Sequence, residues 1–307
     1  LVARDYAWIN PNRTDTFAPA GGQSLLRLIP CIAQLKGWKL ATLDVKDAYL
    51  MCPQKKNIRV TVDKEVAEEL QIPRDWLLGR VLPGQREGAS EWFQHLKGTL
   101  QGAGLKQCAE APTVWSNDTH TIALLIHVDD LIVTGTEEAM SSLLQKLEES
   151  YKVSVEMGDQ VSFLKRTVTS GDGTTKIQVN DKYLDGLVSL FEGVKLRRTL
   201  NEVVLDEKPL ETAEEIGRFR SGVGTLLYLA GDRPDIQFHV KELASKLSSP
   251  TRGAMATLLN VIGYMLYTKD YHLVMDGNNP SRSFRQKAHG DRKSTRLNSS
   301  HVKRSRM

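Results

Sequence analysis

Hydrophobic and polar residues follow two periods along the first half of the chain. Apolar residues recur at helical spacing through 24–36, 89–100 and 137–151. In the second of these predicted helices, Trp92, Phe93 and Leu96 form an apolar stripe that we assign to the core. Stretches of strand length occur at 38–44, 57–62, 113–116, 122–135, 153–156 and 161–168. The order of strand, helix, strand, strand, helix and strand is typical of a split βαβ arrangement, so we predict an α+β fold whose antiparallel sheet is backed by two helices.

The pattern changes near residue 171, where an Asp172-Gly173 turn leads into a region dominated by helical spacing. Helices are predicted at 181–191, 212–229, 234–247 and 253–267. We therefore predict a first domain over 1–170, a mainly helical region over 171–275 and a separate tail over 276–307.

Residues 122–135 form the most unusual stretch, because two apolar runs flank an adjacent pair of carboxylates, Asp129 and Asp130. The pattern predicts a β-hairpin with both aspartates at or near its bend. Neighbouring like charges repel, and each costs several kcal/mol to remove from water unless a positive charge compensates it. The hairpin therefore predicts a bound divalent cation.

A third carboxylate, Asp44, ends the predicted strand 38–44. In a split βαβ sheet this strand can lie beside the hairpin, which would bring Asp44 to the same edge as Asp129 and Asp130. Three hard oxygen ligands suit Mg²⁺. Two such ions would serve an in-line phosphoryl displacement by activating the attacking hydroxyl and neutralising the leaving oxygens.

Composition narrows the class of protein. The hydrophobic content of 40% can supply a core for the 307 residues. Cys31, Cys52 and Cys108 are scattered and lack C-x-x-C spacing, which argues against a disulfide framework or zinc site and favours a reducing, intracellular compartment. The sequence has no apolar run of the roughly 20 residues that a membrane helix needs and no signal-peptide pattern. Without an initiator Met, the chain is expected to begin inside a longer product.

The net charge of +4 does not by itself indicate a nucleic-acid-binding protein. Residues 291–307 contain six Lys or Arg and one Asp, so this segment carries the whole excess and residues 1–290 are slightly acidic. Residues 291–301 resemble a translated sequencing adapter. We therefore expect the basic tail to have no biological role.

Two motifs resemble those of a known enzyme family. Residues 43–49, Leu-Asp-Val-Lys-Asp-Ala-Tyr, resemble the first catalytic motif of reverse transcriptases, and residues 127–130, His-Val-Asp-Asp, resemble their aromatic-x-Asp-Asp motif. Supporting segments lie at 1–4, 16–19, 84–92, 182–184, 220–229 and 233–236. Over about residues 1–270 the chain is similar to the reverse transcriptase of copia-type (LTR) retrotransposon Pol polyproteins. The resemblance implies a right-hand polymerase-like fold, with fingers and a split βαβ palm in 1–170 and a thumb or connection region in 171–275.

The resemblance also implies roles for individual residues in RNA-directed DNA synthesis. Asp44, Asp129 and Asp130 would be the catalytic aspartates that bind two Mg²⁺ ions, with Mn²⁺ as an alternative. The implied nucleotide-binding residues are Val45 through its carbonyl, Asp47 and Ala48 through their backbone, Tyr49 as the aromatic that excludes a ribose 2′-hydroxyl, Gln85 and Arg86. The implied nucleic-acid contacts are His127, Lys165 and Arg166, since residues 163–165 resemble the turn of the primer grip.

Taken singly, these residues have structural explanations too. An Asp-Asp pair is most often a solvated turn, and Gln85-Arg86 could belong to a surface turn after Pro83-Gly84. Tyr49 could be a core aromatic and His127 a hydrogen-bonded sheet histidine. Charge pairs such as Lys165-Arg166 usually lie on solvated faces.

The chain departs from the family pattern at two positions, with His127 where Tyr is commoner and Lys165 where Gly is usual. Basic fingers residues would lie before Leu1, and ribonuclease H and integrase segments are absent. The expected partners are a primed RNA or DNA template, dNTPs and other Pol segments, in a cytoplasmic virus-like particle or the nucleus and without a membrane. The alternatives are a remnant that keeps the palm fold and binds nucleic acid without polymerising, and another palm-type nucleotidyl enzyme such as a cyclase.

Overall fold

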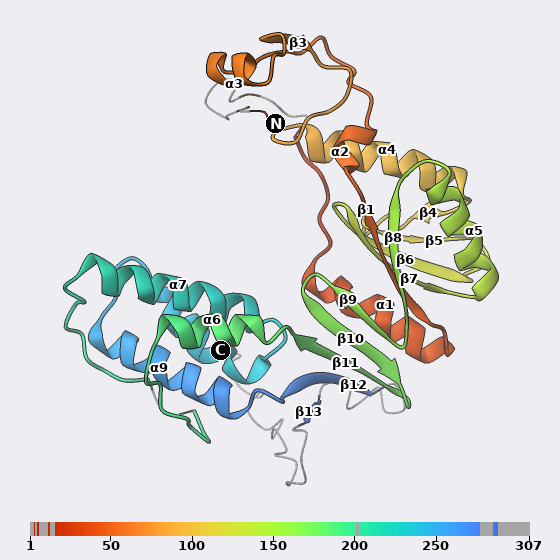
Figure 1. Cartoon of the computed structure of the whole chain (residues 1–307). Coiled ribbons are helices and arrows are strands. Elements are labelled where there is room, and N and C mark those ends of the chain that lie inside the picture. Colours follow the sequence, from red (N-terminus) through yellow and green to blue (C-terminus); the bar gives the residue numbers. More distant parts are fainter. Residues whose placement is uncertain are drawn as a thin grey trace, which may run out of the picture. The chain divides into compact units, whose positions relative to one another are not determined.

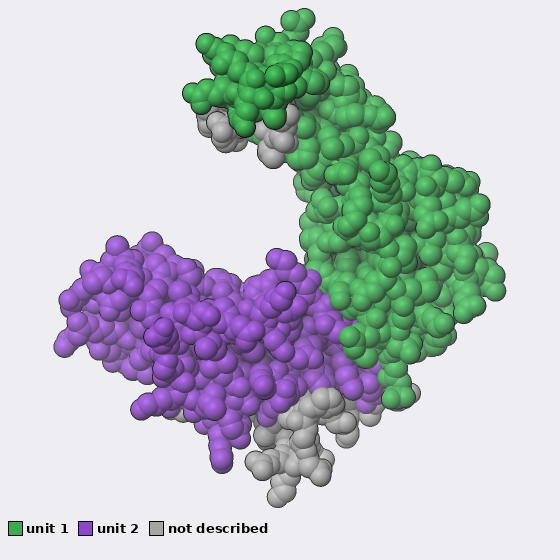
Figure 2. Space-filling model, viewed as in Figure 1, with its two compact units in different colours: residues 1–164, 169–173 green, residues 165–168, 174–307 purple. Residues whose placement is uncertain are grey.

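The computed structural model describes residues 3, 5, 12, 16–200, 203–276 and 285–287. Its contacts divide the chain into two compact units, residues 1–164 with 169–173, and residues 165–168 with 174–307 (Figure 2). Nearly all of the predicted tail, 276–307, lies outside the described residues. No helix in the described ranges is both long and apolar enough to cross a bilayer.

The first unit is built on a six-stranded sheet in the order β4-β5-β6-β7-β1-β8 (Figure 1). These strands are β4 (Lys106–Gln107), β5 (Val114–Ser116), β6 (Ile122–His127), β7 (Asp130–Gly135), β1 (Leu40–Val45) and β8 (Val153–Gly158). Every neighbouring pair is antiparallel. The hairpin β6–β7 therefore lies directly beside β1, an arrangement that the predicted split βαβ sheet allows.

Two helices cover this sheet with a shared apolar core. Helices α4 (Gly88–Gly102) and α5 (Glu137–Glu148) contribute Trp92, Leu96 and Leu143 to a cluster with strand residues such as Leu43 and Leu124. The strand positions between those cluster residues are also buried, because helix α1 (Gln23–Lys36) packs beside β6 and β7. Helix α1 ends at Gly37, whose φ of 66° is the left-handed conformation that glycine adopts without strain.

The remaining elements of the first unit follow β1 in the sequence. It contains α2 (Ala48–Met51), α3 (Lys64–Glu69) and a small two-stranded sheet of β2 (Arg59–Thr61) and β3 (Asp75–Leu77) (Figure 1). Strand β9 (Gln160–Phe163) follows β8.

The second unit contains α6 (Lys182–Leu190), α7 (Ala213–Leu229), η1 (Pro234–Ile236), α8 (Gln237–Ser245) and α9 (Arg252–Tyr267). Their apolar faces form a second core around Phe191, Phe219 and Leu258. Strands β10 (Arg166–Gly171), β11 (Thr174–Val179), β12 (His272–Asp276) and β13 (Arg285–Lys287) neighbour one another in that order. The helices were predicted, whereas β12 was not, because its short apolar run becomes a strand only by pairing with β11.

The α+β class and the antiparallel sheet are confirmed. One element was wrong: residues 161–168 were predicted as a single strand, and the structure breaks them into β9 and β10. Leu164 and Lys165 have φ values of 46° and 60°, which turn the chain between the two strands. Neither residue is a usual left-handed residue, so the sequence did not indicate the turn. The names fingers, palm and thumb stay predictions.

Candidate active site

The hairpin turn between β6 and β7 presents the Asp-Asp pair. His127 and Asp130 are paired across the hairpin, so Val128 and Asp129 are the two residues of the loop. Val128 has a φ of 61°, and a β-branched residue in this region is a conformational outlier. Such a residue costs on the order of 1–3 kcal/mol and is found mostly at functional sites. The turn therefore stores strain at the position where the sequence predicts chemistry.

Both carbonyl groups of this loop are held by hydrogen bonds. The Trp92 indole Nε1–H donates to the Val128 carbonyl at 2.7 Å. The Val45 backbone N–H donates to the Asp129 carbonyl at 3.2 Å. The helical stripe predicts a core position for Trp92, but it does not indicate which distant carbonyl the indole will meet.

The three carboxylates come together as predicted at the level of the backbone. Asp44 is the direct antiparallel partner of Asp130, and Asp129 precedes Asp130 in the exposed part of the turn. Burial raises the pKa of Asp130, and the negative charges of Asp129 and Asp44 raise it further. The three side chains are therefore close enough to repel one another.

The side chains are not arranged as a closed metal cage. Among the described residues, no three His, Cys, Asp or Glu side chains converge closely enough to hold an ion. Instead the Lys46 ammonium lies 2.7 Å from Asp44 Oδ2, and this carboxylate raises the pKa of Lys46. Three mutually repelling carboxylates are a suitable donor set for Mg²⁺. They fit the ion chemically, provided that Asp44 exchanges its lysine partner for the cation.

The residues after β1 line the same edge of the sheet. Asp47 has a φ of 53° and turns the exposed chain into α2, where Ala48 is buried. Tyr49 is half-buried, and burial followed by the charge of Asp129 raises its pKa. A Cβ built on Gly88 would lie 3.4 Å from the Tyr49 ring, so the ring packs against the start of α4. Tyr49 thus combines a packing role with proximity to Asp129.

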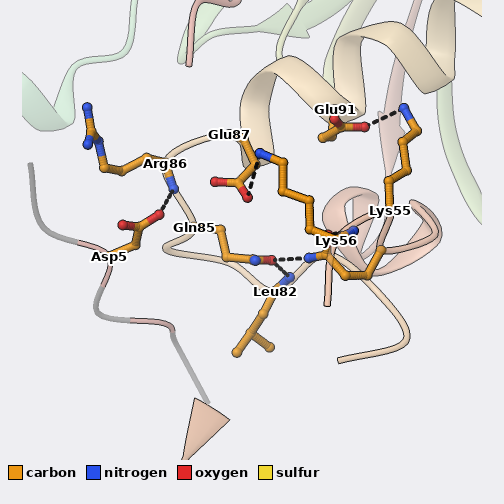
Figure 3. Close-up of polar contacts among 9 residues, drawn as sticks. Asp5, Lys55, Lys56, Leu82, Gln85, Arg86, Glu87 and Glu91 are labelled. Atoms are coloured by element: carbon orange, nitrogen blue, oxygen red, sulfur yellow. Dashed lines mark hydrogen bonds and ion pairs between the residues drawn. The ribbon is translucent and has the colours of Figure 1, made fainter. Parts of the chain in front are cut away.

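Gln85 lies in the loop before α4 and is not a surface residue (Figure 3). Its side-chain Oε1 accepts hydrogen bonds from the Leu82 backbone N–H at 2.6 Å and from Gln54 Nε2 at 3.3 Å. The residue is only 8% exposed, and its Nε2 has no partner among the described groups. An ordinary surface turn would not bury an amide in this way. Gly84 is exposed and has a φ of 93°, as expected for a residue of the surface turn at Pro83-Gly84.

Charged residues surround this loop (Figure 3). Lys55 contacts Glu91 at 2.6 Å, and Lys56 lies 3.7 Å from the buried Glu87 carboxylate. The Arg86 backbone N–H donates to Asp5 Oδ2 at 3.1 Å. The loop before α4 is therefore connected to other segments of the chain through the Arg86 backbone N–H and the Gln85 side chain.

The three predicted nucleic-acid contacts differ in burial and in their partners. His127 is half-buried with no partner at Nδ1 in the described part of the chain, and Lys165 is exposed. Arg166 is only 7% exposed and contacts Asp232 at 2.6 Å and the Tyr228 hydroxyl at 3.1 Å. Its prediction as a phosphate contact was wrong, because the guanidinium is buried in an ion pair. Asp232 lies 66 residues further along the chain, so the sequence did not indicate this pairing.

Comparisons with known proteins identify the family of the chain. The family model described as reverse transcriptase (RNA-dependent DNA polymerase) matches residues 1–197. The chain is 22% and 21% identical to the retrovirus-related Pol polyproteins from transposons RE1 and RE2 of Arabidopsis thaliana, in each case over 86% of its length. It spans 18% of each of these relatives. A structure of apo telomerase from Candida tropicalis, truncated from its C-terminal domain, is 10% identical to this chain. The match covers 50% of this chain and 39% of the telomerase chain, with a TM-score of 0.31.

The matched region includes both motifs that carried the predicted resemblance to a copia-type reverse transcriptase, and that prediction is confirmed. The chain belongs to the reverse transcriptase (RNA-dependent DNA polymerase) family.

Proposed function

We propose that this chain is the polymerase segment of a retrotransposon Pol polyprotein and extends a primer with deoxynucleotides on an RNA or DNA template. The observation that carries the proposal is the register that sets Asp44 opposite Asp130, beside Asp129 in a strained turn. The relatives are transposon polyproteins. On that basis we also propose other Pol segments as partners and an intracellular location, in a cytoplasmic virus-like particle or the nucleus.

In the proposed mechanism Asp44, Asp129 and Asp130 hold two divalent ions, Mg²⁺ or Mn²⁺. When bound, these ions activate the primer 3′-hydroxyl and neutralise charge on the phosphate oxygens. To hold an ion, Asp44 would have to exchange its ion pair with Lys46 for the cation. A bound cation would offset the negative charges of Asp129 and Asp44, which raise the pKa of Asp130 in addition to burial.

The nucleotide would lie along the segment between β1 and α4. The backbone carbonyl of Val45 would be a further metal ligand, and the backbone of Asp47 and Ala48 would bind the triphosphate. Tyr49 is assigned to exclude a ribose 2′-hydroxyl, as the family resemblance implies. The free Nε2 of Gln85 supplies a preorganised donor, because its Oε1 is already fixed by the loop.

The remaining contacts concern the primer and template. Arg86 lies in the same loop as Gln85, and its side chain is assigned to the nucleotide or template. His127 follows the last buried residue of β6 and is assigned to the template strand. Lys165, exposed in the turn between β9 and β10, is assigned to the primer backbone. Arg166 has no such role.

The test is primer extension on an RNA template with Mg²⁺. Asp129→Asn removes one charge with little change in shape and is expected to abolish extension. Asp118→Asn is the matched control, because Asp118 contacts only the exposed Lys106 at 2.7 Å in the described structure and lies outside the site. Full extension by Asp129→Asn would show that the assigned metal role is wrong.

A second candidate is a remnant that binds nucleic acid without polymerising. The pairing of Lys46 with Asp44 in place of a three-carboxylate cluster favours it. The same assay separates the two functions, since a remnant retains a primer–template duplex in a filter-binding measurement and extends nothing. Product that forms without any template would indicate a cyclase-type enzyme instead.

A further inference from the structure

Two elements that both precede the β6–β7 hairpin in the sequence, β1 and α4, form hydrogen bonds to its loop. Trp92 belongs to α4 and donates its indole N–H to the Val128 carbonyl at 2.7 Å. Val45 ends β1 and donates its backbone N–H to the Asp129 carbonyl at 3.2 Å. The second bond extends the sheet and is formed by any hairpin in this register. The first comes from a side chain and could be removed without changing the backbone.

The loop needs such a hold because its conformation is unfavourable by itself. Val128 has a φ of 61°, and Val is a β-branched residue that avoids this region. Two-residue hairpin loops place Gly at such a position. A loop that lost its external hydrogen bond would gain freedom to relax, and Asp129, as the second loop residue, would move with it. The adjoining Asp130 opens β7 and would share the movement.

The donor is itself rigid. Trp92 is 1% exposed, and its ring meets the edge of Tyr151 with the ring centroids 5.3 Å apart. The Tyr151 hydroxyl is hydrogen-bonded to the Thr99 hydroxyl at 2.6 Å. Packing against Tyr151 thus fixes the direction of the Trp92 indole N–H independently of the hairpin loop. A preorganised donor of this kind loses no side-chain entropy when it binds.

We propose that Trp92 is a positioning residue for the catalytic hairpin, which it holds by the hydrogen bond from its indole to the Val128 carbonyl. This inference rests on the proposed function and extends it to a residue that contacts neither metal nor substrate. The bond keeps the loop in the conformation from which Asp129 and Asp130 reach the same ions as Asp44.

The chain contains its own control. Trp115 in β5 belongs to the same core cluster and is 0% exposed. Its indole N–H has no hydrogen-bond partner in the part of the chain that the structure describes. Trp92→Phe and Trp115→Phe therefore remove similar apolar volume from one core, and only the first removes a hydrogen bond to the hairpin.

The experiment compares Trp92→Phe with Trp115→Phe by amide hydrogen exchange over residues 126–131, by Mn²⁺ titration followed by electron paramagnetic resonance, and by steady-state kinetics. Trp92→Phe is expected to accelerate exchange in the loop by about tenfold, the factor that the loss of one hydrogen bond corresponds to. We also expect Trp92→Phe to lower the Mn²⁺ affinity and kcat, while KM for dNTP stays within twofold of the wild-type value. Trp115→Phe is expected to leave exchange, affinity and kcat at wild-type values.

Replacing Trp92 with β-(3-benzothienyl)alanine gives a second, shape-preserving variant, because sulfur takes the place of the N–H. This variant should reproduce the faster loop exchange, while its melting temperature stays at the wild-type value. Equal loop exchange and Mn²⁺ affinity in the wild type and this variant would overturn the positioning role. Exchange and Mn²⁺ binding do not require polymerisation, so the positioning role can fail while primer extension persists, and extension can be absent while the loop still loosens.

Discussion

Lys165 occupies the second position of the turn between β9 and β10, where the backbone favours glycine. Its φ is 60°, and its neighbour Leu164 has a φ of 46°. The side chain of Lys165 is exposed. Replacing it with Gly therefore sacrifices little packing, and the Lys165 carbonyl that accepts from the Asn180 N–H at 3.2 Å is retained. We predict that Lys165→Gly stabilises the protein.

The magnitude follows from two opposing terms. A non-glycine residue in the left-handed region costs roughly 1–2 kcal/mol, which Gly avoids. The greater freedom of Gly in the unfolded chain costs about 0.5–1 kcal/mol. The difference is a gain of about 0.5–1 kcal/mol in the free energy of unfolding. For a unit of this size it corresponds to a rise in melting temperature of roughly 1–4 °C.

Thermal unfolding followed by circular dichroism measures this shift, and Lys165→Ala is the control. Alanine removes the long side chain and its charge but retains the Cβ that causes the strain, so its melting temperature should match the wild type. Equal melting temperatures for the Gly and Ala variants would refute the strain argument. A lower value for Gly would show that the turn tolerates Lys without cost.

Two further predictions concern charged side chains. Because the pKa of Asp130 is raised on folding, its ionised form disfavours the folded state, and this penalty appears as pH rises through the raised pKa. Asp130→Asn should therefore raise the melting temperature at pH 8, with the gain disappearing as pH falls below the usual carboxylate range, and a pH-independent difference would contradict this origin. Arg166→Met should cost about 3–5 kcal/mol in urea unfolding by removing the ion pair that Arg166 forms with the buried Asp232 carboxylate, while the Arg166→Met/Asp232→Leu double variant should cost less. A loss below about 1 kcal/mol for the single variant would mean that Asp232 finds another partner or water.

Local patterns in the sequence were enough for most helices and for the catalytic hairpin. Gly37 ends α1 where a left-handed residue is required, and Thr136 begins α5 by accepting a hydrogen bond from the Ala139 N–H. The two apolar runs around Asp129 and Asp130 specified β6 and β7 because a strand of this kind is recognised from its own residues. The family could also be predicted from the sequence, because each of its two motifs is a continuous run of residues.

Pairings between distant segments were decided only by the tertiary structure. The register of Asp44 with Asp130, the ion pair of Arg166 with Asp232 and the strand formed by residues 272–276 all depend on which segments pack together. The hydrogen bond from Trp92 to Val128 is of the same kind, because burial determines that an indole is in the core and only the fold determines which carbonyl it meets. Sequence alone therefore identified the carboxylates and the hairpin that carries two of them, while the fold decided how their side chains are paired and held.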